Sequence, residues 1–230
     1  AYLPQANGTI LRFKDSDSTL TRVAGSGSGA APSLSGGPSL GVSMGALGPG
    51  IFDDDVLYFL DPEVGQARAL AIEEGAESGV ITPFAGRLPE GYLEAGQYDA
   101  LFRGPSGMAA GVEGEELALY IVDGGNSVLR KLVNGETSLL VGTPGVDAFG
   151  GDQGPASLAT LRGPKKVARA EDGTLYILTE GRIRRVKDGI ITTVAGNGES
   201  GYNGDVIPGV EALLGAPSDI ALSQDGASLY

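Results

Sequence analysis

Cysteine, histidine and tryptophan are all absent from this chain of 230 residues. Without cysteine there is no disulfide and no thiolate to act as nucleophile or metal ligand. Without histidine the chain lacks the usual general base and the commonest metal-ligating side chain. A Ser-His-Asp triad is therefore excluded. We expect a protein without a catalytic role and without a dedicated cofactor.

Long apolar runs and positive charge are also scarce. No run approaches the roughly 20 apolar residues that cross a bilayer, so no membrane insertion is expected. The first four residues, Ala-Tyr-Leu-Pro, lack the basic start and apolar stretch of a signal peptide. The 16 Lys and Arg stand against 29 Asp and Glu, which gives a net charge of −13. Because an acidic surface repels phosphate backbones, no nucleic-acid partner is expected.

Turn-forming residues are abundant instead. The chain has 39 Gly and 13 Pro, spread along its length, and 41% of its residues are hydrophobic. Glycine reaches positive φ without strain and proline presets φ for a turn. This composition predicts many short strands joined by tight turns, in an all-β protein.

Four short segments recur in a fixed order. The first is an apolar Leu-Tyr strand, whose tyrosines at positions 2, 58, 120, 176 and 230 are separated by 56, 62, 56 and 54 residues. It is followed by a strand such as 127–132, then by an alternating segment that closes on small residues, such as 192–196. A Pro-led strand, as in 104–109, 163–168 and 216–221, precedes the next Leu-Tyr. Asn-Gly and Asp-Gly pairs between strands, at 134–135 and 188–189, predict two-residue hairpins.

Four-stranded antiparallel sheets in series are the blades of a β-propeller. We therefore expect residues 1–230 to form one propeller, or part of one, with about four blades. The repeats run approximately over 2–57, 58–119, 120–175 and 176–230.

The repeat resembles that of the NHL-repeat β-propeller family. Residues 123–131 resemble its Asp…Asn…Ile-Arg-Lys phrase, and 194–205 resemble its Val-Ala-Gly turn and Gly-Asp loop. Residues 156–164 match the Ala…Leu…Pro lead into the next blade. The similarity covers 51–230 and is specific in 101–230. Because the family's propellers usually have about six blades, the resemblance implies further blades from the same or another chain, or an unusual four-bladed ring.

The resemblance favours a binding scaffold for a protein or glycan, located at the cell surface, outside the cell or in the periplasm. Its Gly-rich loops, roughly 25–50, 86–103, 142–162 and 196–215, are the expected contact segments. A Ca²⁺-dependent hydrolase or lyase with its site in the propeller channel is the first alternative. A structural module of a larger surface or appendage protein is the second.

Two Gly-Asp loops are the candidates for a metal. Asp152 follows Phe149-Gly-Gly and Asp205 follows Tyr202-Asn-Gly, 53 residues further on. Ca²⁺ takes six to eight oxygen ligands, whereas each loop offers one carboxylate. The sequence therefore favours a structural role, in which the Asp side chain accepts hydrogen bonds within its own loop.

Residues 162–187 form a basic segment, which holds half of all Lys and Arg and only three acids. Strand alternation predicts that Arg182 and Arg184 share one face, with Ile183 pointing inward between them. Such a patch suits an acidic protein or a polyanion, although pairing with neighbouring acidic residues is the more ordinary interpretation. The partner-binding candidates are Arg162, Lys165, Lys166, Arg169, Arg182, Arg184, Arg185 and Lys187.

Overall fold

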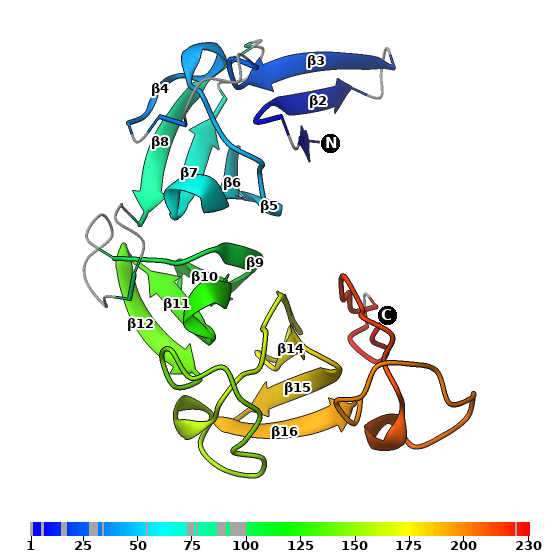
Figure 1. Ribbon diagram of the computed structural model, residues 1–230. Helices are drawn as coiled ribbons and strands as arrows, with labels where there is room; N and C mark the ends of the chain where they lie inside the picture. Colours follow the sequence, from blue (N-terminus) through cyan, green and yellow to red (C-terminus); the bar gives the residue numbers. More distant parts are fainter. Residues whose placement is uncertain are drawn as a thin grey trace. The chain divides into compact units, whose positions relative to one another are not determined.

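A computed structural model gives the fold of the chain (Figure 1). It describes residues 1–230 apart from 1, 6, 15–17, 28–31, 34, 54, 73–75, 77, 87–90, 93–99 and 224. Most of the expected loop 86–103 therefore lies outside the described residues. The chain divides into two compact units, Ala1–Pro105 and Ser106–Tyr230. Among the described residues, no helix has the length and apolar character to cross a membrane.

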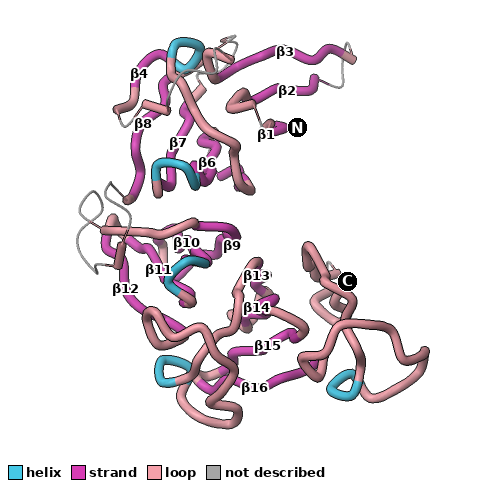
Figure 2. The backbone as a smooth tube through the Cα atoms, in the orientation of Figure 1, coloured by secondary structure: helices cyan, strands magenta, loops and turns pink. Residues whose placement is uncertain are grey.

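Strands and loops make up almost all of the described chain, with single turns of 3₁₀-helix between them (Figure 2). The first unit holds two antiparallel sheets. One has the order β1-β2-β3, and the other β4-β8-β7-β6-β5. Their strands are β1 (Tyr2–Pro4), β2 (Ile10–Lys14), β3 (Thr19–Ala24), β4 (Gly37–Pro38), β5 (Gly50–Asp53), β6 (Val56–Asp61), β7 (Gln66–Ala71) and β8 (Val80–Ala85).

The second unit holds two four-stranded antiparallel sheets, each built from consecutive strands. Their orders are β12-β11-β10-β9 and β13-β14-β15-β16. The strands are β9 (Pro105–Glu113), β10 (Glu116–Asp123), β11 (Val128–Val133), β12 (Glu136–Val141), β13 (Lys166–Arg169), β14 (Leu175–Thr179), β15 (Arg182–Lys187) and β16 (Ile190–Ala195). The short 3₁₀ turns η4 (Ala156–Leu158) and η5 (Gly209–Glu211) lie in the loops that follow β12 and β16.

The predicted four-stranded repeat is confirmed. The Leu-Tyr segments with Tyr58, Tyr120 and Tyr176 each form the second strand of a sheet, whereas Tyr2 lies in the first strand, β1, and Tyr230 in no strand. A repeat counted from one of these three segments to the next therefore contains three strands of one sheet and the first strand of the following one. The predicted hairpin turns are present too, because Asn134 and Gly135 have φ of 50° and 76°, and Asp188 and Gly189 have φ of 51° and 74°.

The Pro-led segment 216–221 differs from the prediction. Its counterparts begin β9 and β13, but here only an isolated bridge forms, between Leu222 and Leu229, with mutual backbone hydrogen bonds between Ala221 and Tyr230. A β-strand needs a hydrogen-bonded partner strand. Among the described residues, this segment has no partner beyond the isolated bridge.

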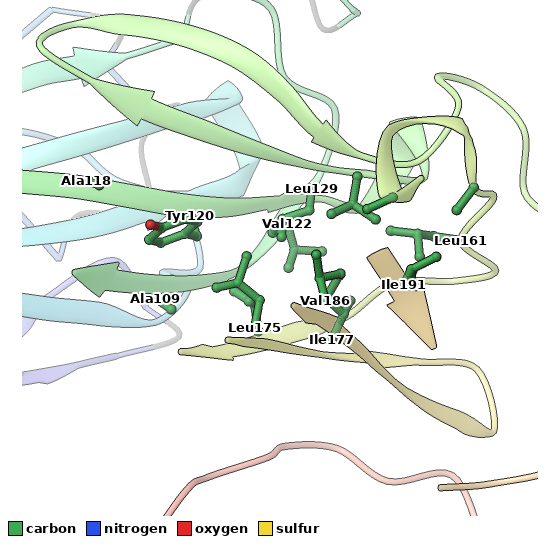
Figure 3. Close-up of a cluster of buried hydrophobic side chains, with 14 residues drawn as sticks. Ala109, Ala118, Tyr120, Val122, Leu129, Leu161, Leu175, Ile177, Val186 and Ile191 are labelled. Carbon is green, nitrogen blue, oxygen red and sulfur yellow. The ribbon is translucent and has the colours of Figure 1, made fainter. Parts of the chain in front are cut away.

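The core of each unit lies between the faces of its two sheets. In the second unit, Tyr120, Val122 and Leu129 pack with Leu175 and other residues of the facing sheet (Figure 3). In the first unit, Ile10, Val23 and Ala24 pack with residues of β6, β7 and β8. The recurring Leu-Tyr strand therefore supplies inter-sheet core in both units.

Each of the three larger sheets buries an arginine at the third position of its third strand. These residues are Arg68, Arg130 and Arg184, all with no exposed surface. The strand pairing shifts register immediately before each of them, which marks a β-bulge. The extra residue lies in the following strand, β8, β12 or β16, so the strand that carries the arginine keeps its regular alternation. The sequence predicted the strands but not the burial of their arginines.

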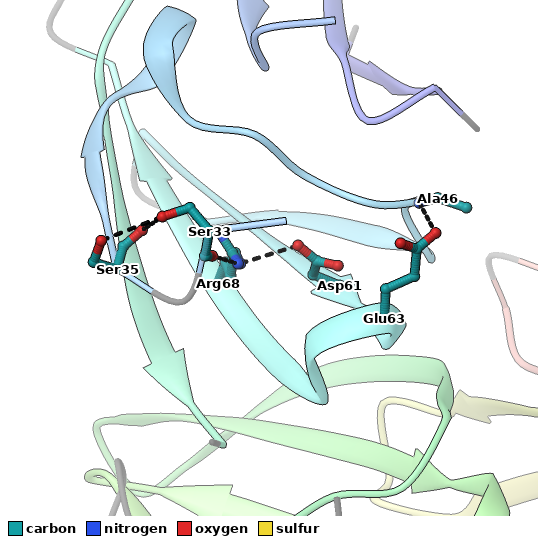
Figure 4. A network of polar contacts seen from close by, with 6 residues as sticks. All are labelled: Ser33, Ser35, Ala46, Asp61, Glu63 and Arg68. Carbon is teal, nitrogen blue, oxygen red and sulfur yellow. Dashed lines mark hydrogen bonds and ion pairs between the residues drawn. The ribbon is translucent and has the colours of Figure 1, made fainter. Parts of the chain in front are cut away.

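The first two arginines are neutralised by the aspartate that ends the Leu-Tyr strand. Arg68 Nε lies 3.2 Å from Asp61 Oδ2, and Arg68 also donates to the Ser33 carbonyl (Figure 4). Arg130 Nη1 lies 3.6 Å from Asp123 Oδ2. In the fourth repeat this aspartate is replaced by Thr179, and the counter-ion comes from a loop instead.

Candidate binding site

The basic residues of the 162–187 segment lie on both faces of the β13–β16 sheet. Leu175 and Val186 are opposite each other in the strand pairing and belong to the core between the two sheets. The next pair, Tyr176 and Arg185, must point to the other face, because side chains alternate along a strand. The candidate residues are thus divided between a buried face and an open one.

Arg184 belongs to the buried face, so the prediction that it forms part of an exposed patch is wrong. Its side chain is fully buried, and its Nη2 lies 2.8 Å from Asp152 Oδ1. It also donates to the carbonyls of Gly150 and Thr160. Ile183 is only half-buried, on the opposite face. Arg182 and Arg184 do share one face of β15, as alternation predicted, but this face, rather than that of Ile183, is turned toward the core.

Three further candidates have local protein partners. Arg182 stacks on the ring of Phe149, 3.8 Å from its centroid, and donates to the Asn197 carbonyl. Arg162 forms an exposed ion pair with Glu180 at 2.9 Å. Lys166 Nζ lies 3.8 Å from Asp219 Oδ2. These contacts match the more ordinary interpretation of the basic segment.

The remaining side chains of the open face border a cavity of about 500 Å³ beside β14 and β15. Its wall on the sheet side includes three side chains of the open face, Tyr176, Arg185 and Lys187, and is bordered by Arg169 at the end of β13. The other wall is the segment 222–226, as far as it is described. All of these residues belong to the second unit.

Charges in this cavity are partly neutralised. Lys187 Nζ lies 2.9 Å from Asp172 Oδ2, and this contact raises the pKa of Lys187 and lowers the pKa of Asp172. Asp225 accepts hydrogen bonds from Ser223 and from the Ala227 amide, which lower its pKa. Asp172 and Asp225 are thereby committed to partners within the protein, whereas Glu171, the third acid that borders the cavity, is an exposed side chain.

Arg185 is the cation that remains available. Its half-buried side chain makes no ion pair or hydrogen bond with another described residue, although it borders the cavity beside Tyr176. Arg169 is committed on the other face, where its guanidinium lies 5.7 Å from the Tyr120 ring centroid. Lys165, the last candidate, is exposed and does not line the cavity. The cavity thus offers one available guanidinium next to an aromatic ring.

The metal candidates are two isolated carboxylates. Asp152 is bound to Arg184, and Asp205 accepts a hydrogen bond from the Tyr202 hydroxyl at 2.8 Å. In the part of the chain that is described, no three acidic side chains gather where they could hold an ion. Asp152 is therefore paired with an arginine of β15, whereas the sequence predicted hydrogen bonds within its own loop.

Sequence comparison gives no assignment, because no protein-family model and no curated protein matches this chain. Solved structures do match its fold. A structural genomics protein of unknown function from Bacteroides thetaiotaomicron has a TM-score of 0.64 at 19% identity, over 96% of this chain and 50% of its own length. An auxiliary nutrient binding protein from the same organism has a TM-score of 0.58 at 13% identity. The match covers 76% of this chain and 42% of that protein. A streptogramin B lyase has a TM-score of 0.55 at 16% identity, and the match covers 97% of this chain and 54% of the lyase.

These similarities establish the fold class. The four-stranded antiparallel sheets and the propeller-type neighbours together make the chain an all-β protein of β-propeller type. The chain spans about half the length of the solved structures that it matches. At identities below 20%, the likeness concerns the fold and does not extend to the activity of any neighbour.

Proposed function

We propose that this chain is a non-catalytic binding scaffold of the NHL-like propeller type, and that its cavity beside β14 and β15 binds a carboxylate group on a protein or glycan. The observation that carries the proposal is Arg185. It is a half-buried guanidinium without a described protein partner, in a cavity of about 500 Å³.

The chemistry of the cavity suits a carboxylate. A guanidinium presents paired N–H donors that match the two oxygens of a carboxylate, and such charge-assisted bonds are stronger than neutral ones. Tyr176 borders the same cavity and provides an apolar ring surface with a polar tip. Because Asp172 is bound to Lys187, it does not neutralise Arg185. An acidic sugar would place its carboxylate on Arg185 and its ring beside Tyr176.

We propose a location outside the cytoplasm, at the cell surface or in the periplasm. Support comes from neighbours of the same fold that are described as auxiliary nutrient binding proteins of Bacteroides. A Ca²⁺-dependent hydrolase or lyase has no comparable support in the described residues, because Asp152 and Asp205 each bind a neighbouring side chain.

A binding titration tests this function. The full chain is titrated calorimetrically with an oligogalacturonate and with a poly-glutamate peptide, and the neutral methyl-esterified oligogalacturonate serves as ligand control. We expect saturable binding of at least one acidic ligand and none of the neutral one. Arg185→Gln should weaken binding about tenfold or more, since it removes the charge-assisted contact.

Arg162→Gln is the matched control variant. It removes an arginine of the same basic segment that is already paired with Glu180, outside the cavity. It should bind the acidic ligand like the wild type. Equal losses in the two variants would show that general charge, rather than Arg185, carries the binding, and no binding of either acidic ligand would reject the proposed site.

A further inference from the structure

A second cavity, of about 390 Å³, is bordered by both sheets of the second unit. The β12-β11-β10-β9 sheet contributes Glu113, Tyr120, Leu139 and Leu140. The other wall consists of β14, β15, the turns that follow β13 and β15, and the η4 turn. All lining residues lie within 113–189, so two complete four-stranded sheets form this cavity. Its volume is within the range of roughly 300–1,000 Å³ that is usual for small-molecule sites.

The apolar part of this cavity comes from four aliphatic side chains. Leu175 and Val186 are opposite each other in the pairing of β14 with β15, and both belong to the core (Figure 3). Leu139 and Leu140 are half-buried residues of β12. The register shift between β11 and β12 leaves Leu140 as the extra residue of a β-bulge, which changes the direction of a side chain. The bulge explains why two consecutive leucines border one cavity, where regular alternation would send one of them to the opposite face.

The charged groups that line this cavity are two carboxylates, and none of the described Lys and Arg residues lines it. Glu113 is already neutralised, because it accepts hydrogen bonds from Lys131 Nζ at 2.8 Å and from the Tyr120 hydroxyl at 2.7 Å. The exposed Asp188 side chain forms no ion pair or hydrogen bond with another described residue. Its sequence neighbour, Lys187, is bound to Asp172 instead. Asp188 is therefore the anion that remains available.

The turn that carries Asp188 does not require its negative charge. Asp188 precedes Gly189 in the two-residue turn between β15 and β16, where its φ is 51°. Asn134 takes the equivalent place between β11 and β12, with a φ of 50°. Both residue types tolerate this left-handed conformation. The fold therefore explains a residue of this shape at position 188, but it does not explain the carboxylate.

We propose that this cavity binds a small organic cation in which a protonated amine is attached to an apolar ring or chain. The ammonium group donates a charge-assisted hydrogen bond to Asp188, and the apolar part lies against Leu139 and Leu140. Charge complementarity decides between possible ligands. The cavity combines aliphatic carbon with carboxylates, so it attracts a cation and repels an anion that has the same apolar part.

This amine site is separate from the Arg185 cavity. The two cavities share no lining residue. They lie on opposite faces of the β13–β16 sheet, because Tyr176 and Arg185 border one cavity, whereas Leu175 and Val186 border the other. The amine site therefore goes beyond the proposed function and does not depend on it.

Three indole ligands test the amine site by NMR on the full, ¹⁵N-labelled chain. Tryptamine carries an ammonium group, tryptophol carries a hydroxyl in its place, and indole-3-propionate carries a carboxylate. We expect saturable shifts of the amides of residues 139–140, 156–157 and 186–189 with tryptamine. Tryptophol should bind about fivefold more weakly, because it lacks the charge that pairs with an exposed carboxylate. Indole-3-propionate should produce no saturable shift of these amides.

Protein variants locate the binding. Asp188→Asn introduces the residue type that the β11–β12 turn already uses, so the hairpin should keep its structure. It should weaken the binding of tryptamine to the level of tryptophol and leave the binding of tryptophol unchanged. Asp205→Asn is the matched control, because Asp205 is an exposed aspartate outside the cavity, and it should bind tryptamine like the wild type.

Three results would overturn the amine site. They are the absence of saturable shifts with tryptamine, equal binding of tryptamine and tryptophol, and equal losses in Asp188→Asn and Asp205→Asn, which would show that general negative charge attracts the amine. Arg185→Gln should leave tryptamine binding unchanged. Loss of acidic-ligand binding in that variant would be a separate result, which concerns only the proposed function.

Discussion

Each of the three larger sheets buries one arginine, and taking its charge out of water costs free energy of folding. Arg130 illustrates how the cost is offset. It lies near Asp123, and its Nη2 donates to Thr137 Oγ1 at 2.8 Å, while Asn126 holds the same aspartate at 2.9 Å. A buried ion pair stabilises little compared with an apolar pair, but removing one partner strands the other charge. The network therefore acts mainly to enforce one arrangement of the sheet.

Asp123→Ala should accordingly be among the most destabilising substitutions. It leaves Arg130 buried without its counter-ion, and we expect a loss of about 3–5 kcal/mol in the free energy of unfolding. Asp152→Ala should cost clearly less, because Asp152 is 34% exposed and Arg184 keeps two carbonyl acceptors. Urea unfolding of both variants measures the difference, and an Asp123→Ala variant as stable as Asp152→Ala would contradict this account.

Glu113 gives a prediction for acid stability. Hydrogen bonds from Lys131 and then from Tyr120 lower the pKa of Glu113 below its ordinary value of 4.5. Its contribution to stability is thus complete above pH 4.5 and is lost as the pH falls through the lowered pKa of the folded state. Glu113→Gln should therefore lose less stability than the wild type when the pH falls below 4.5. Denaturation curves at a series of pH values measure this, and parallel losses would refute it.

At the scale of the element, close contact between two sheets depends on Gly107 in β9. A Cβ atom there would lie 2.6 Å from the Lys165 carbonyl oxygen and 2.8 Å from the Lys166 Cα. Both neighbours are backbone atoms, so they cannot move aside as the end of a side chain would. The glycine lets β9 approach the start of β13.

Gly107→Ala should therefore destabilise the second unit, by about 1–3 kcal/mol. Gly41→Ala is the matched control, because a Cβ at Gly41 meets no atom within 4 Å and its φ is not positive. Thermal unfolding compares the two variants. A melting temperature for Gly107→Ala equal to that of Gly41→Ala would show that the sheets have room to separate.

The positions of the strands and turns were predictable from sequence. Which side chains of a strand are buried was predictable only in part. The Leu-Tyr spacing and the Asn-Gly and Asp-Gly pairs are local signals, and the structure reproduces them except at Leu229-Tyr230, which forms no strand. The burial of Arg184 was not predictable in this way, because it depends on which face of β15 packs against the other sheet and on the loop aspartate Asp152, 32 residues earlier. The signal that could have revealed it is the repeated arginine at one position of the repeat.

The cavity required the structure for a similar reason. Arg185 differs from its neighbours only in having no counter-ion, and the sequence cannot show that Glu180 and Asp172 are bound to other cations. A basic segment predicts a region of charge, whereas pairing in three dimensions decides which of its cations remain available.

At the scale of the whole molecule, net charge decides which polyanions can bind. The chain carries −13, so its average field repels a nucleic-acid backbone, and one local guanidinium does not reverse that field. We expect no binding of single-stranded RNA at about 0.15 M salt. Fluorescence anisotropy with a labelled oligonucleotide measures this, and a saturable signal that weakens as salt rises would contradict the expectation.

The most direct test of a non-catalytic binding role follows the fate of the ligand. The chain is incubated with an excess of oligogalacturonate, bound ligand is separated from free ligand, and both are analysed by mass spectrometry. The account predicts saturable binding of intact oligosaccharide that is about tenfold or more weaker in Arg185→Gln. Shortened or unsaturated products that accumulate with time would contradict it and show that the chain is an enzyme.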